Sequence, residues 1–211
     1  MFTDRREAGK RLAVELARRH GSDVVVLGLP RGGVPVAAEV AAALGAPLDV
    51  LVVRKVGVPW QPELALAAVG EGGAVAFTQR VVETSGLSPE QVRRLVAAAA
   101  EQVEQVTTEL RGDTPALDVK GRTVVVVDDG VATGATARAA AAVLRHRGAG
   151  HVLLAVPVAS PEVVPLLEHD YDELVVLEEP ARLHSVGEWY RRFGQVSTAE
   201  ARDLLVASRP A

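Results

Sequence analysis

The chain contains 211 residues, of which 48% are hydrophobic and 24% are charged, and its formal net charge is −4. A chain of this size and composition builds a globular body with a substantial apolar core, which excludes a disordered or fibrous protein. The acidic balance provides no overall basic footprint, so nucleic acid is not an expected partner.

Residue usage also indicates where the protein works. Cysteine is absent, which excludes disulfide bonds and thiolate metal sites. Residues 1–10 lack the apolar segment of a signal peptide, and no window reaches the roughly 18 apolar residues of a membrane span. We therefore expect a cytoplasmic protein without a membrane partner. Of the 23 basic residues only Lys10, Lys55 and Lys120 are lysine, which indicates a GC-rich genome and makes each lysine worth inspecting.

The first part of the chain alternates between helical and strand patterns. In chain order the pattern predicts a helix from Asp4 to Arg19 that stops at His20-Gly21, a strand from Val24 to Leu27, a helix from about Pro35 to Gly45, and a strand that ends in Arg54-Lys55. This order is typical of a parallel sheet covered by helices.

The second part continues the same alternation. It predicts one or two strands between Leu64 and Phe77, a helix from Ser88 to Leu110, a strand of four valines from Val124, a helix from about Gly134 to His146, a strand from His151 to Val158, a helix from about Pro161 to Glu168, and a strand from Leu174 to Leu177. We expect an α/β core over residues 1–178, a parallel sheet flanked by helices, with a helical insertion at about residues 78–118. Residues 179–211 change character and are expected to form a small cap.

The stretch "VVVVDDGVATGAT" places two acids at the end of a strand and a glycine-rich loop after them. Ligands bind outside the carboxyl ends of parallel strands. The N–H groups of the loop and the hydroxyls of Thr133 and Thr136 can converge on an anion at the start of the next helix. The carboxylates of Asp128 and Asp129 would repel a phosphate, so they suit vicinal hydroxyls or a hydrated divalent cation. A ligand that carries both hydroxyls and a phosphate, such as a ribose 5-phosphate, suits both the acid pair and the anion-binding loop.

A simpler interpretation is that Asp129-Gly130 is a turn and Asp128 a capping residue. That interpretation leaves two acids, two threonines and two glycines within nine residues unexplained. A Walker loop is excluded, because no lysine follows the loop glycine. The ligand-binding interpretation requires that both acid side chains are free of buried ion pairs and that the pocket is open.

This stretch resembles the phosphoribosyl diphosphate (PRPP) motif of type I phosphoribosyltransferases. The resemblance implies that Asp128 and Asp129 hold the ribose 2- and 3-hydroxyls. It also implies that the loop wraps the 5-phosphate, through Gly130, Val131, Ala132, Thr133, Gly134, Ala135 and Thr136.

Two further stretches follow the family's chain order. "LPRGGVPVAAEV" looks like the pyrophosphate loop of adenine phosphoribosyltransferases, with Arg31, Gly32 and Gly33; taken alone, it also suits an ordinary glycine-rich turn. "VVRKVGVPW" is similar to the Arg-Lys stretch of adenine and orotate enzymes, with Arg54 and Lys55. A solvated strand end is the alternative for that basic pair.

The resemblance implies the type I phosphoribosyltransferase fold and a place in nucleotide metabolism. A nitrogen nucleophile would displace pyrophosphate from C1 of PRPP, with Lys55 and Arg31 as catalytic groups. Mg²⁺ would come with PRPP and reach Asp128 and Asp129 through water. Ala132 stands where hypoxanthine-guanine enzymes carry an aspartate, so a purine such as adenine is slightly favoured as acceptor. Nearly the whole chain resembles bacterial phosphoribosyltransferase-like proteins with unsettled substrates, and a homodimer would be unsurprising for the family.

Some assignments stay open at this stage. Glu63 and Glu71 are candidates for a general base, or else exposed surface carboxylates. Trp189 and Tyr190 could form an acceptor pocket by stacking on a base, or could pack the cap onto the sheet. His184 could hydrogen-bond a substrate or serve structure. The alternative function is that of a non-catalytic regulatory protein that binds PRPP or a nucleotide.

Overall fold

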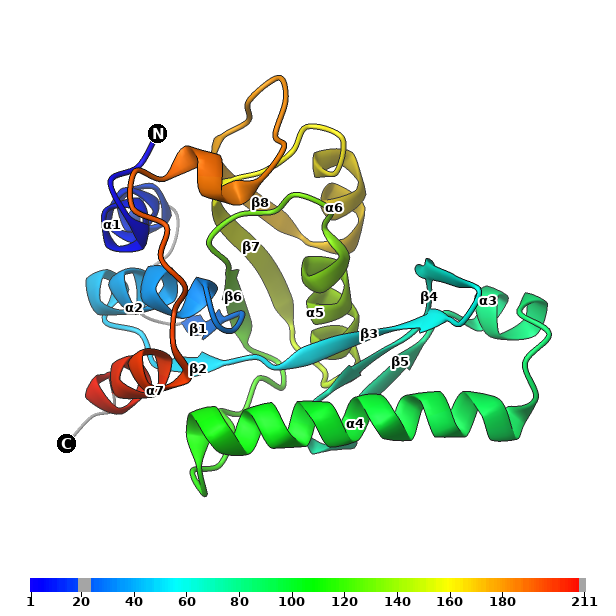
Figure 1. Ribbon diagram of the computed structural model, residues 1–211. Coiled ribbons are helices and arrows are strands. Elements are labelled where there is room, and N and C mark those ends of the chain that lie inside the picture. Colours follow the sequence, from blue (N-terminus) through cyan, green and yellow to red (C-terminus); the bar gives the residue numbers. More distant parts are fainter. Residues whose placement is uncertain (19–23, 209–211) are drawn as a thin grey trace.

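The computed structural model describes residues 1–18 and 24–208, arranged as a sheet-centred body from which an arm projects (Figure 1). The expected helix stop at His20-Gly21 lies outside the described residues. The elements are α1 (Arg5–Ala17), β1 (Val24–Gly28), α2 (Gly33–Leu44), β2 (Leu48–Val50), β3 (Val53–Val58), β4 (Gln61–Gly70), η1 (Glu71–Gly73), β5 (Val75–Phe77), α3 (Gln79–Thr84), α4 (Pro89–Arg111), β6 (Thr123–Val127), α5 (Ala135–His146), β7 (His151–Val158), α6 (Val164–Asp170), β8 (Glu173–Glu178), η2 (Val186–Trp189) and α7 (Thr198–Ala207).

The body is built on a five-stranded parallel sheet with the strand order β2-β1-β6-β7-β8. Alternate residues of the central strands enter two separate apolar layers. Val125 and Val127 pack in the layer that contains α1 and α2, whereas Val124 and Val126 pack in the layer that contains α5. Because both faces are covered, the central strands are continuous valine and leucine runs. The predicted α/β fold is confirmed.

The predicted strand that ends in Arg54-Lys55 is wrong in its extent, because the structure divides it. β2 joins the parallel sheet, and β3 begins an antiparallel sheet with β4 and β5. Between them, the Leu51 N–H donates to the carbonyl of Gly28 and the Val52 N–H donates to Glu71. Arg54 and Lys55 therefore lie near the start of β3. The apolar run shows no break, so its pattern could not reveal the change of sheet.

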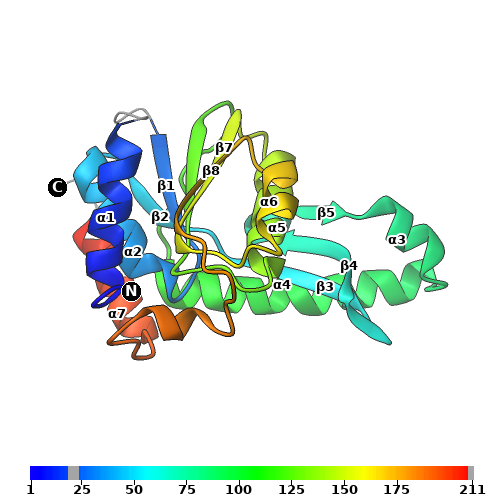
Figure 2. The ribbon, with the colours of Figure 1, turned by 90° about the horizontal axis from the view of Figure 1, so that it is seen from above.

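The arm consists of the antiparallel sheet, α3 and α4, and it reaches away from the body in both views (Figures 1 and 2). Ser88 caps α4, and the capping box with Gln91 is complete. The buried residues Val92, Val103 and Leu110 lie along the side of α4 that faces the small sheet. The arm begins near residue 53, so it is larger than the helical insertion expected at about residues 78–118.

The C-terminal part of the chain contacts two different regions of the protein. Residues 189–192 run beside the N-terminus, where the Phe2 N–H donates to the Trp189 carbonyl over 2.7 Å and the Arg191 N–H donates to the Phe2 carbonyl over 2.8 Å. We call residues 1–4 together with residues 179–197 the cap. The last helix, α7, instead packs against α2 and α4. Within the described ranges, no helix is long and apolar enough to cross a membrane.

Candidate functional site

A cavity of about 680 Å³ lies where loops leave the carboxyl ends of β1 and β6. Five residues that the sequence singled out line it together: Arg31, Arg54, Lys55, Ala135 and Thr136. The other lining residues are Pro30, Leu51, Val52, Val53, Val106, Glu109, Leu110 and Thr198. The cavity is therefore lined by residues of the three predicted loops, by one side of α4 and by the start of α7.

The loop between β6 and α5 is held in a shape that exposes donors. The Val131 N–H donates to the Val158 carbonyl over 2.9 Å, and the Ser160 N–H donates to the Val131 carbonyl over 2.8 Å, which ties the loop to β7. Gly134 has φ +74, a left-handed conformation that favours glycine. No side chain caps α5, while Thr133 is exposed and Thr136 lines the cavity. The helix start thus offers free N–H groups and two hydroxyls to an anion.

The loop before α2 lies directly against the two acids. A Cβ atom on Gly32 would collide with Oδ2 of Asp129, and one on Gly33 would lie 2.5 Å from the Val127 carbonyl oxygen. Glycine is required at both positions by this close approach. Arg31 is exposed, and its guanidinium lies 3.4 Å from the hydroxyl of Thr198. The loop therefore presents an arginine on the cavity side and backbone on the acid side.

The acid pair ends β6 in a largely buried position. Oδ1 of Asp128 accepts from the Asp129 N–H over 2.9 Å, and Oδ2 of Asp129 accepts from Nε of Arg5 over 2.8 Å. Burial raises the pKa of both carboxyls; the charge of Asp129 raises that of Asp128 further, whereas Arg5 acts in the opposite direction. The requirement that both acids be free of ion pairs is therefore not met: Asp129 is paired. The acids also lie beside the cavity lining, behind Gly32 and Gly33.

The two candidate bases of the arm, Glu63 and Glu71, each pair with a basic side chain. Nζ of Lys55 lies 3.0 Å from Glu63, whose side chain is 86% exposed, and such a pair is worth less than about 1 kcal/mol. Lys55 can therefore exchange this partner for a ligand. Glu71, a candidate base, is buried and paired with Arg111, so it is not available for proton transfer. Sequence reasoning missed Glu109, which shares one face of α4 with Val106 and Leu110.

The two aromatic residues of the cap have different surroundings. Tyr190 is 6% exposed, its ring lies 5.5 Å from that of Phe2 and 5.0 Å from that of Phe193, and its hydroxyl donates to the Asp129 carbonyl over 2.6 Å. Burial raises the pKa of this phenol. An acceptor pocket that includes Tyr190 is therefore wrong, because the ring has no free face. Trp189 is half-buried, and His184 is exposed.

A model of the phosphoribosyl transferase domain matches residues 3–189. The chain belongs to the phosphoribosyl transferase family. Two curated Mycobacterium tuberculosis proteins, from strains CDC 1551 / Oshkosh and H37Rv, bear the provisional name phosphoribosyl transferase and are each 46% identical over 205 residues. Those residues are 97% of this chain and 46% of each relative, so the chain spans about half their length.

Solved structures also resemble this phosphoribosyl transferase domain. The crystal structure of TT1426 from Thermus thermophilus has 43% sequence identity and a TM-score of 0.93, and the match covers 99% of both chains. The AQ2163 protein from Aquifex aeolicus has a TM-score of 0.52 at 15% identity over 87% of this chain and 76% of its own, which shows the fold alone.

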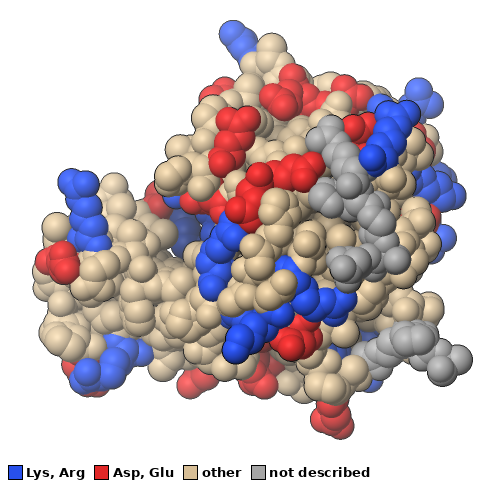
Figure 3. Space-filling view, turned by 180° about the vertical axis from the view of Figure 1, so that it is seen from behind, with Lys and Arg blue, Asp and Glu red and all other residues tan. Residues whose placement is uncertain are grey.

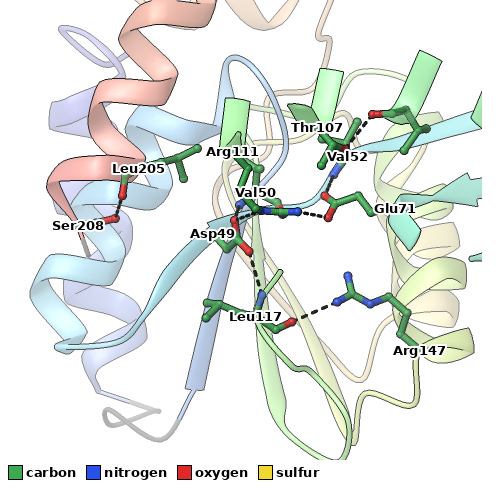
Figure 4. A network of polar contacts seen from close by, with 11 residues as sticks. Asp49, Val50, Val52, Glu71, Thr107, Arg111, Leu117, Arg147, Leu205 and Ser208 are labelled. Carbon is green, nitrogen blue, oxygen red and sulfur yellow. Dashed lines mark hydrogen bonds and ion pairs between the residues drawn. The ribbon is translucent and has the colours of Figure 1, made fainter. Parts of the chain in front are cut away.

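A buried charge cluster holds the arm against the phosphoribosyl transferase body (Figure 4). Arg111, at the end of α4, lies 2.9 Å from Asp49 of β2 and 2.5 Å from Glu71, and also donates to the Val50 carbonyl. Burial opposes the charge of Arg111, but the two carboxylates raise its pKa above the usual value. Because Glu109 and Leu110 precede Arg111, the cluster also positions the α4 wall of the cavity.

The face of the domain opposite the view of Figure 1 carries both acidic and basic side chains. In Figure 3, acidic side chains gather over the upper part of the body, and basic side chains gather below them near the middle of the face.

Proposed function

We propose that the domain is a phosphoribosyltransferase that uses PRPP and Mg²⁺, transfers ribose 5-phosphate to a nitrogen nucleophile and releases pyrophosphate. One observation carries the proposal: the three motif loops, distant in sequence, meet at one cavity. Arg31, Lys55 and Thr136 line the same space, and Gly32 touches the carboxylate of Asp129. Three independent anion-facing loops suit a ligand with phosphates at both ends.

The proposed roles follow from the chemistry of each loop. Residues 130–136 bind the 5-phosphate with backbone N–H groups and the hydroxyls of Thr133 and Thr136. Residues 31–33 with Arg54 and Lys55 bind the pyrophosphate. As the C1–O bond breaks and the N–C1 bond forms, negative charge collects on the leaving group. Arg31 and Lys55, which line the cavity, would offset that charge, so catalysis would act through positioning and electrostatics.

The residues fit a metal that arrives with the substrate. The described residues contain no group of three or more acidic, histidine or cysteine side chains that could hold an ion. Mg²⁺ usually keeps several waters and binds through one or two carboxylates plus substrate phosphates. Asp128 and Asp129 would reach it through water. When bound, the ion would neutralise part of the charge of the pyrophosphate.

The acceptor is proposed to be nucleobase-like, with a purine such as adenine slightly favoured. Ala132 offers no side-chain group for a ring nitrogen or oxygen, which disfavours an acceptor that needs an acid at this position. The half-buried Trp189 belongs to η2, and η2 lies close to the acid loop because a Cβ on Gly130 would lie 2.6 Å from Val186. Trp189 thus stays a proposed acceptor contact.

A second candidate is a non-catalytic protein that binds PRPP or a nucleotide and regulates a partner. Two observations favour it: Glu71 is locked in the Arg111 cluster, and Glu63 is an exposed partner of Lys55. Neither is a positioned general base. The curated relatives, twice as long, have room for a further activity.

The two candidates are separated by titrating the protein with PRPP and Mg²⁺ in a calorimeter and assaying pyrophosphate release with nucleobases and small amines. The proposal predicts binding heat at millimolar PRPP and turnover with one acceptor class. The absence of heat would contradict the transferase and the PRPP-binding form of the regulatory candidate. Binding without pyrophosphate release for any acceptor would support the regulatory one.

The substitution Gly32→Ala tests whether the pyrophosphate loop must touch the acid pair. The backbone of Gly32 is right-handed helical, so alanine fits its φ and ψ, but the new methyl group would collide with the Asp129 carboxylate. We expect the dissociation constant for PRPP to rise about tenfold or more, the loss of one charge-assisted hydrogen bond. Calorimetry measures it.

Gly194→Ala is the matched control. Gly194 lies in the cap, and a Cβ there would meet nothing within 4 Å. Alanine keeps the backbone carbonyl that accepts from Arg5, so this variant should bind PRPP like the wild type. If Gly32→Ala also binds like the wild type, the loop and the acids do not form one ligand site.

A further inference from the structure

Arg5 connects the first helix of the domain to the acid pair. It lies in the first turn of α1, and its Nε donates to Oδ2 of Asp129 over 2.8 Å, across 124 positions of sequence. Its Nη1 donates to the Gly194 carbonyl over 2.8 Å, and its guanidinium carbon lies 3.9 Å from the ring centre of Phe193. The side chains of Arg5 and Asp129 are 11% and 14% exposed. Arg5 is thus fixed on three sides.

The charges at this point explain why a cation is needed. Asp128 and Asp129 are adjacent, both are desolvated, and the charge of Asp129 disfavours ionisation of Asp128. Arg5 is the cation in hydrogen-bond contact with the pair among the described residues, and Tyr190 adds a neutral hydroxyl that donates to the Asp129 carbonyl. Without Arg5, Oδ2 of Asp129 would lose its side-chain donor, and the carboxylate would be free to turn away from the orientation that leaves Oδ1 open.

The hydrogen bonds leave one oxygen of each acid available. Asp128 uses Oδ1 and Asp129 uses Oδ2. No hydrogen bond within the described residues uses Oδ2 of Asp128 or Oδ1 of Asp129, and no buried side-chain oxygen there lacks a partner. These two oxygens therefore reach the surface. Two acceptors on adjacent residues match the two donors of a vicinal diol.

We propose that Arg5 is a positioning residue for sugar recognition: by holding Oδ2 of Asp129, it presents Oδ1 of Asp129 and Oδ2 of Asp128 to the 2- and 3-hydroxyls of the ribose. The proposal rests on the proposed function and assigns to it a residue that lies outside the three motif loops. The ion pair then becomes part of the diol site instead of an obstacle to it. Because Arg5 also holds Gly194 and Phe193, the cap and the sugar site are one unit.

The test compares ligands that differ by one hydroxyl. Wild-type protein, Arg5→Gln and Arg5→Lys are titrated with ribose 5-phosphate, its 2-deoxy and 3-deoxy analogues, and pyrophosphate. We expect the wild type to prefer ribose 5-phosphate over at least one deoxy analogue by about tenfold or more, the value of one hydrogen bond to a charged group. In Arg5→Gln this preference should fall to about twofold. Arg5→Lys keeps the charge without the guanidinium fork, so its preference for ribose 5-phosphate should lie between those of the wild type and Arg5→Gln.

The control measurements separate this role from a structural one. In the proposed site the pyrophosphate is bound by residues 31–33 with Arg54 and Lys55, so its affinity, measured without Mg²⁺, should stay unchanged in both Arg5 variants. Arg192→Gln breaks a neighbouring ion pair, Arg192–Asp4 at 2.6 Å, and should keep the full preference for ribose. A structural role for Arg5 would instead lower the affinity for all four ligands together. If Arg5→Gln does not fold, Arg5→Lys carries the test.

Besides that uniform loss of affinity, three outcomes would overturn the inference. In the first, the Arg5 variants keep the wild-type preference for ribose. In the second, they bind ribose 5-phosphate more tightly, which would make Arg5 a competitor of the diol. In the third, wild-type protein binds neither ribose 5-phosphate nor PRPP, which overturns the proposed function as well and so is distinguishable from the other two.

Discussion

Replacement of Asp128 and Asp129 by asparagine together is expected to abolish measurable PRPP binding while the fold is kept. The two free carboxylate oxygens are the proposed acceptors of the ribose hydroxyls, and each hydrogen bond to a charged group is worth about 1.5–3 kcal/mol. Loss of both should raise the dissociation constant by about 10²–10⁴-fold. Calorimetry with PRPP and Mg²⁺ measures this, and circular dichroism and urea unfolding report on the fold.

Asparagine removes two desolvated charges, yet its amide oxygen can still accept from Arg5. Since burial raises the pKa of both acids, the charged forms are costly in the folded state, so stability should change little. Asp170→Asn is the matched control, because Asp170 also pairs with an arginine, Arg138 at 2.7 Å, and lies in α6, outside the three motif loops. Wild-type PRPP affinity in the double variant would remove the diol role from these residues.

The substitution Arg111→Met is expected to destabilise the domain by about 3–5 kcal/mol, the cost of leaving a buried ion pair without one partner. Methionine keeps much of the length of the side chain but leaves Asp49 and Glu71 without their cation. The free energy of unfolding in urea measures the loss. Because Arg111 joins α4 to β2 and η1, the variant should also loosen the α4 wall of the cavity, which protease digestion of the arm would detect.

Two further variants decide whether the charge cluster causes that loss. Arg94→Met on the same helix removes an exposed pair with Glu90 and should cost less than about 1 kcal/mol. Arg111→Met combined with Asp49→Asn and Glu71→Gln should recover much of the loss, because no unpaired charge remains buried. A loss below about 1 kcal/mol in Arg111→Met alone would contradict the clamping role.

Much of the phosphoribosyl transferase body could be predicted from local pattern. The strand from His151 to Val158 lies where the pattern places it, and Ser88 begins α4 as its Ser-Pro-Glu sequence indicates. These signals act within a few residues, since side-chain period and capping are local properties. The acid and glycine residues of the three loops were identified in the same way, because their residue types are tied to anions and hydroxyls.

Other features of the site depend on pairings that no local pattern contains. Glu71 could be an exposed base or a buried ion, and only its contact with Arg111 decides. Tyr190 could stack on a ligand or pack in the cap, and only its position between Phe2 and Phe193 decides. The sequence places Glu109 on one face of a helix, but it does not show that this face lines the cavity.

By itself, then, the sequence determined the α/β class, most element positions and the residue types that the three loops offer, because hydrophobic period, caps and motif residues are properties of neighbouring positions. The tertiary structure alone decided that one apolar run serves two sheets and that the loops share a cavity. It also decided that Arg5 meets Asp129 and that Arg111 meets Asp49 and Glu71. With 23 basic and 27 acidic residues, many pairings are electrostatically acceptable. Long-range packing selects among them, because only buried, well-oriented pairs contribute strongly to stability and to the site.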